Sequence, residues 1–137
     1  MAGKWSGSIV EFLDQGRFQA GLVVREQDRH LAIVDAAGHE RLVSRDLIMQ
    51  HYPERRPARE EARAAISALQ EERAALAAEL DLNLLWEVAQ EQGRSFSAGE
   101  LAELFFGRRS TTGTSVLLEA LINDRLFFVR RHLEFLP

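Results

Sequence analysis

The sequence contains no cysteine, only three prolines and no long apolar run. The absence of cysteine excludes a disulfide framework and a cysteine-ligated zinc site, so packed apolar side chains must stabilise the fold. No apolar run approaches the roughly 18 residues that cross a bilayer, and residues 1–5 lack the apolar stretch of a signal peptide. We therefore expect a cytoplasmic protein without a membrane segment.

Lysine is also scarce, because sixteen of the seventeen basic residues are arginine, and the formal net charge is −4. This acidic balance argues against a nucleic-acid binder, although the placement of the cations matters more than their sum. From residue 105 onward the balance reverses to a local surplus of two positive charges. The five arginines there are Arg108, Arg109, Arg125, Arg130 and Arg131. The C-terminal end is the electrostatic candidate for a binding surface.

Residues 5–52 have the pattern of short strands separated by turns. Runs rich in Val, Ile and Phe predict strands over 8–13, 18–25, 31–35, 40–43 and 48–52. Glycines at 16 and 38 mark turns, and residues 44–47 read as one helical turn capped by Ser44. Five short strands with a helical turn before the last predict a small SH3-like β-barrel over residues 1–53.

Pro53 and Pro57 separate this region from a long helical pattern. Over residues 58–80 one face is apolar and the other carries Glu and Arg. The apolar positions are Ala62, Ala65, Ile66, Leu69, Leu76 and Leu80. We expect residues 54–80 to form a connecting amphipathic helix docked on a neighbour, with a dimerisation helix as the alternative.

Residues 81–137 predict three short helices followed by a hairpin. The first helix spans 83–92 and stops at Gly93, and Ser97 with Glu100 forms a capping box for the second. Gly107 ends the second helix, and residues 123–124 end the third. Strands are expected over 126–129 and 133–136. This order predicts a C-terminal winged helix, a helix-turn-helix variant, within an α+β chain.

In a winged helix the third helix and the hairpin tip are the usual contacts to nucleic acid. Arginines and hydroxyl side chains occur at both places, and the first turn of a helix favours a phosphate. The candidate RNA-binding residues are Arg108, Arg109, Thr111, Thr112, Ser115, Arg125, Arg130, Arg131 and His132. The hydroxyl groups would equally serve as helix caps. The arginine pairs could also be solvated surface residues.

The predicted barrel carries aromatic residues that could stack on RNA bases, namely Trp5, Phe18 and Tyr52. Lys4, Arg17 and Arg25 accompany them. The alternative is that so small a barrel uses these rings in its own core.

No pattern of an active site is present. The sequence contains no His-x-x-x-His, no aspartate-rich cluster and no glycine-rich phosphate loop, so we assign no catalytic residue, metal ligand or cofactor to this chain. Whether a larger parent protein is an enzyme stays open at this point.

Several segments together resemble the N-terminal region of ribonuclease II family exoribonucleases of the cyanobacterial and chloroplast type. The segments are residues 8–12, 31–35, 97–106 and 117–128. The resemblance implies a role in holding or guiding RNA to a covalently linked catalytic domain absent from this chain. That domain would be a magnesium-dependent 3′-to-5′ exoribonuclease. We expect a monomer, either a fragment of such a protein or a free-standing relative.

Two other functions remain open from the sequence. A winged helix also occurs in DNA-binding regulators, because a fold does not determine a function. The acidic balance and the exposed faces of the central helix would also suit a protein-interaction module.

Overall fold

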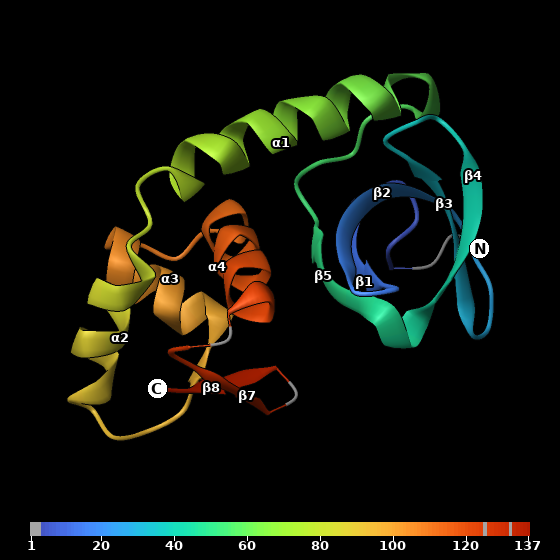
Figure 1. Cartoon of the computed structure of the whole chain (residues 1–137). Helices are drawn as coiled ribbons and strands as arrows, with labels where there is room; N and C mark the ends of the chain where they lie inside the picture. Colours follow the sequence, from blue (N-terminus) through green and yellow to red (C-terminus); the bar gives the residue numbers. More distant parts are fainter. Residues whose placement is uncertain (1–3, 125, 132) are drawn as a thin grey trace. The chain divides into compact units, whose positions relative to one another are not determined.

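The computed structural model describes residues 4–124, 126–131 and 133–137. The chain divides into two compact units, Met1–Gln70 and Glu71–Pro137. Each unit is described by itself below (Figure 1).

The first unit is built on a five-stranded antiparallel sheet with the strand order β4-β3-β2-β1-β5. The strands are β1 (Ile9–Asp14), β2 (Arg17–Glu26), β3 (His30–Asp35), β4 (Glu40–Ser44) and β5 (Ile48–Tyr52). All five predicted strands are confirmed to within two residues. Irregularities in register at Glu11/Phe12 and Val23/Arg25 bend the sheet, and Figure 1 shows the strands curling around a common centre.

The expected barrel is not closed. No ladder joins the edge strands β4 and β5 within the described residues. The 3₁₀ turn η1 (Arg45–Leu47) separates them and redirects the chain, so that β5 pairs with β1. Direct pairing of β4 with β5 would need a hairpin connection that η1 does not provide.

The predicted turns of the sheet are confirmed. Gln15 and Gly16 both have positive φ, 52° and 75°, which is the two-residue hairpin geometry that fits the twist of β1 and β2. Ser44 caps η1 by accepting a hydrogen bond from the Asp46 amide at 3.3 Å. Local turn chemistry therefore sets the register of the meander.

Helix α1 (Ala62–Ala77) follows the 3₁₀ turn η2 (Arg59–Glu61) and is shorter than the predicted 58–80. Ile66 and Leu69 are fully buried and pack with Ile9 and Tyr52 on one side of the sheet. Each such side chain stabilises the unit by about 1.5–3 kcal/mol. The other side of the sheet encloses a separate apolar cluster that includes Val10, Phe12, Val23, Leu31, Ile33 and Val43.

The second unit combines three helices with a small sheet. Its elements are α2 (Leu82–Gln90), β6 (Phe96–Ser97), α3 (Ala98–Phe106), α4 (Thr111–Asn123), β7 (Val129–Arg131) and β8 (Glu134–Leu136). The predicted order of three helices and a hairpin is confirmed. The sequence did not predict β6, which pairs with β8 and makes a three-stranded sheet.

Local capping defines the helices of this unit. Ser97 Oγ accepts from the Glu100 amide at 3.1 Å, and Glu100 Oε1 accepts from the Ser97 amide at 2.9 Å, so the capping box is confirmed. Gly107 ends α3 in the left-handed conformation with φ of 82°. Leu85, Leu101 and Leu117 are buried between the helices.

The predicted strand over 126–129 is wrong for most of its length. The Asp124 carboxylate accepts hydrogen bonds from the amides of Leu126, Phe127 and Phe128 at 3.0, 3.2 and 2.7 Å. These bonds hold the backbone in a turn, because a short acidic side chain competes with strand pairing for nearby amides. The strand begins only at Val129, so Arg130 and Arg131 lie within β7 and not in the hairpin turn.

Candidate nucleic-acid interface

The N-terminal end of α4 is organised by its own hydroxyl groups. Ser110 Oγ accepts from the Gly113 amide at 2.9 Å, and Thr114 Oγ1 donates to the Ser110 carbonyl at 2.8 Å. Ser110 and Thr114 therefore satisfy local backbone groups. Thr111 and Thr112 are half-buried at the same end of the helix, whereas Ser115 is fully buried and its hydroxyl is inaccessible to a surface ligand.

Arg108 and Arg109 lie between Gly107, which ends α3, and the cap of α4. Both are exposed. Arg109 Nε is 3.7 Å from Glu103 Oε2, with both side chains more than half exposed, so this ion pair is weak. Arg108 makes no ion pair or hydrogen bond through its side chain within the described part of the chain. Arg108 is thus the cation here that is best placed to meet a phosphate.

The two arginines of the hairpin point in opposite directions. In β7, Arg130 lies opposite Phe135 and Arg131 lies opposite Glu134. Successive side chains of a strand alternate between faces, so Arg130 shares the face of the buried Phe135 and Arg131 lies on the outer face. One surface cannot use both guanidinium groups equally. Two further predicted site residues, Arg125 and His132, lie outside the described residues.

The two predicted groups of cations are also separated along α4. This helix has 13 residues and spans about 20 Å. Arg108 and Arg109 precede its first residue, whereas β7 begins six residues after its last. The two groups of cations therefore flank α4 on either side in the sequence.

Comparison with known protein families identifies the second unit. Residues 67–136, just over half of the chain, match the family described as the ribonuclease II winged helix domain. The chain belongs to this family. No curated protein and no solved structure matches it.

The ribonuclease II winged helix lies in the acidic part of the chain. Residues 71–137 carry seven basic and eleven acidic side chains, whereas residues 1–70 carry ten of each. The net negative charge of this unit therefore opposes the attraction of a polyanion to the arginines that precede α4. Any attraction of a polyanion depends on their local exposure.

Sequence reasoning missed a groove of about 510 Å³ beside α3 in the winged helix. Arg94 lies 4.0 Å above the ring of Phe96 and donates to Glu100 at 3.2 Å, while Arg109 faces Glu103. The Ser97 amide and then Arg94 lower the pKa of Glu100, which favours its charged form. Each arginine of the groove faces a carboxylate, so the groove itself carries no surplus of positive charge. Only the fold shows this, because no sequence motif links these residues, which come from α3 and the segments on either side of it.

Two of the candidate aromatic residues of the first unit, Tyr52 and Trp5, contribute to its own structure. Tyr52 is fully buried, and Arg25 is paired with Glu40 at 2.6 Å. Trp5 is half-buried against the apolar cluster, with Lys4 and Arg45 within 5.9 and 5.7 Å of its ring. These surroundings leave Trp5 poorly placed to stack on a base.

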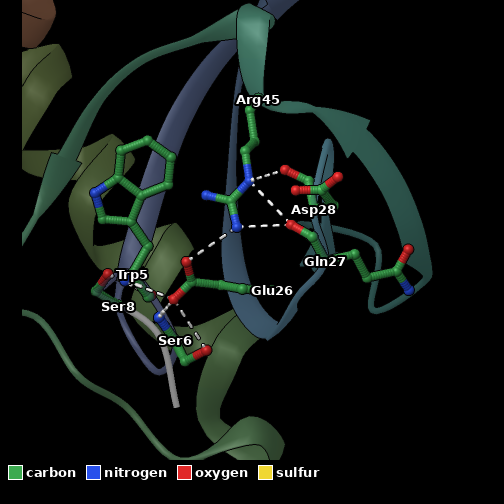
Figure 2. Close-up of polar contacts among 7 residues, drawn as sticks. All are labelled: Trp5, Ser6, Ser8, Glu26, Gln27, Asp28 and Arg45. Carbon is green, nitrogen blue, oxygen red and sulfur yellow. Dashed lines mark hydrogen bonds and ion pairs between the residues drawn. The ribbon is translucent and has the colours of Figure 1, made fainter. Parts of the chain in front are cut away.

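Figure 2 shows the network that holds the Trp5 segment to the sheet. Glu26 Oε2 accepts from the amides of Trp5 and Ser6 at 2.8 and 2.9 Å, while its other oxygen meets Arg45 at 3.3 Å. Burial raises the pKa of Glu26, but these three partners together outweigh it and bring the pKa below its ordinary value. The cluster is therefore an ionised clamp within the first unit.

Within the described ranges, no group of three or more histidine and acidic side chains is placed to hold a metal ion. No described helix combines the length and the apolar character needed to cross a membrane.

Proposed function

We propose that this chain is an RNA-binding module of a ribonuclease II family 3′-to-5′ exoribonuclease of the cyanobacterial and chloroplast type. Its role would be to hold or guide RNA toward a covalently linked catalytic domain, which would carry the magnesium. The observation that carries the proposal is the family of residues 67–136. The division into an SH3-like region (1–53), a connector (54–80) and a winged helix (81–137) is part of the same proposal.

The proposed contact is the start of α4. Arg108 and Arg109 are exposed there, and Thr111 and Thr112 lie in the first turn. The free amides and the dipole of a helix N-terminus attract a phosphate, and arginine can add a bidentate contact. Phosphate contacts of this kind hold RNA without reading its sequence.

Arg130 belongs to the proposal as a second, peripheral contact. It is exposed in β7, on the face opposite to Arg131. Ser115 is left out because it is buried, and Arg131 is left out because it shares its face with Glu134. A contact with so few cations in an acidic unit is expected to bind weakly and to depend strongly on salt.

A fluorescence anisotropy titration with a labelled single-stranded RNA tests the proposal. Arg108→Glu combined with Arg109→Glu is expected to weaken binding about tenfold or more, because it reverses two contacts. Arg29→Glu combined with Arg63→Glu changes the charge equally at exposed positions of the first unit and serves as the control. Equal losses in both variants would contradict a site at α4. Tighter binding to duplex DNA of the same length would favour a DNA-binding regulator.

A further inference from the structure

The hairpin of the second unit exposes an unusual amount of apolar surface. Leu126, Val129, Leu133 and Leu136 are 84%, 58%, 47% and 37% exposed. Single exposed apolar side chains are common on proteins, but Val129 and Leu136 are direct partners across the hairpin and form one exposed apolar pair. RNA backbone would gain little from these side chains.

The strand register places an apolar pair beside a charged pair. Val129 lies opposite Leu136, and Arg131 lies opposite Glu134. Cross-strand partners share a face, and alternate residues of one strand share it too, so all four side chains lie on one face. Phe135 lies on the other face and is fully buried. The Val129 side is therefore the outer face of the hairpin.

This outer face is complementary to itself. If two copies meet across a two-fold axis parallel to the strands, Arg131 of each can lie against Glu134 of the other, and Val129 of each can pack on Leu136 of the other beside the charged pairs. Arg131 makes no ion pair or hydrogen bond through its side chain within the described residues, and Glu134 is held by Ser95 Oγ at 3.2 Å. Both charges are exposed and available.

We infer that the outer face of the β7–β8 hairpin is a contact between two copies of this chain. Pairing of the open β7 edges is less favourable, because an antiparallel register centred on Arg130 would place like charges opposite each other. The contact goes beyond the proposed RNA function and does not use Arg108 or Arg109. It departs from the monomer expected from the sequence.

Sedimentation equilibrium of the whole chain, without nucleic acid, tests this inference. A single hairpin face is smaller than the roughly 1,200 Å² of a stable interface, so a weak dimer is expected to form between about 10 and 500 μM. Arg131→Glu and Glu134→Arg should each give a monomer throughout this range. Mixed in equal amounts, the two variants should form a dimer, because the acidic pair of one meets the basic pair of the other.

Several outcomes would overturn the inference. They are a wild-type monomer at all concentrations, single variants that dimerise like the wild type, or a mixture that stays monomeric. A loss of RNA affinity in Arg131→Glu without any change in mass would assign the face to RNA instead. Val129→Ser, with an unchanged circular dichroism spectrum, should also weaken the dimer and separates loss of contact from loss of fold.

Discussion

Tyr52 Oη donates a hydrogen bond to Glu11 Oε2 at 3.1 Å, and both side chains are fully buried. Gln50 Nε2 donates to the other carboxylate oxygen at 2.6 Å. These contacts join β1 to β5, the strand that follows the 3₁₀ turn η1. A buried carboxylate is tolerated only where donors replace water, so the pair helps to select this strand order.

Tyr52→Phe should therefore destabilise the first unit by about 1–3 kcal/mol, since a buried carboxylate loses a donor. Urea denaturation followed by circular dichroism measures the change. In a Glu11→Gln background, Tyr52→Phe should lower the free energy of unfolding by less, because the side chain that accepts the hydrogen bond is then neutral. An equal cost in both backgrounds would show that the hydroxyl does not act through Glu11.

Close packing of β2 and β3 gives a second prediction. A Cβ atom at Gly21 would lie 2.8 Å from Cδ1 of Ile33, a distance that real structures essentially never show. Gly21→Ala should cost about 1–3 kcal/mol through overpacking, although alanine suits a strand better than glycine does. Adding Ile33→Val removes Cδ1 and should restore part of the loss. Thermal melts of the two variants would reveal whether it does.

The Glu26 clamp predicts a pH dependence. Because the folded pKa of Glu26 is lowered, its stabilisation is fully present above the unfolded value of 4.5 and is lost as the pH falls through the folded value. Glu26→Gln should thus be about 1–2 kcal/mol less stable than the wild type near pH 7. The gap should narrow below pH 4.5. Denaturation midpoints at pH 7 and at acidic pH test this, and a gap that does not change with pH would exclude an ionised clamp.

The cap of α4 constrains Gly113. A Cβ atom there would approach Ser110 Oγ to 2.9 Å. Helix propensity alone favours alanine by about 1 kcal/mol, but Gly113→Ala should instead destabilise the winged helix by displacing the capping hydroxyl. In a Ser110→Ala background the substitution should become neutral or stabilising. The four-variant cycle, measured by chemical denaturation, isolates this coupling.

The salt dependence of RNA binding tests the proposed contact separately from the affinity measured at a single salt concentration. If two to three arginines contact phosphates of a single-stranded RNA, the binding constant should fall as salt is added. A plot of its logarithm against the logarithm of the salt concentration should have a slope of about −2. Replacing Arg108 and Arg109 by alanine should bring the slope closer to zero. An unchanged slope would place the phosphate contacts elsewhere in the chain.

Much of the local structure was predictable because it depends on neighbours in the sequence. The turn at Gly16, the cap at Ser44, the capping box at Ser97 and the stop at Gly107 were all expected and all confirmed. Each relies on hydrogen bonds or dihedral preferences within a few residues. The strand predicted over 126–129 was wrong for most of its length, because a carboxylate that captures three amides outweighs the β propensity of residues 126–128.

The sequence by itself determined the order of the main helices and strands, the cap and the stop of α3, and the winged-helix plan, since these follow from short-range periodicity and capping. Only the tertiary structure decided that the sheet stays open, that β6 joins β8, and that Arg130 and Arg131 face opposite ways. These features depend on pairing register, and a shift of one residue moves every side chain to the other face.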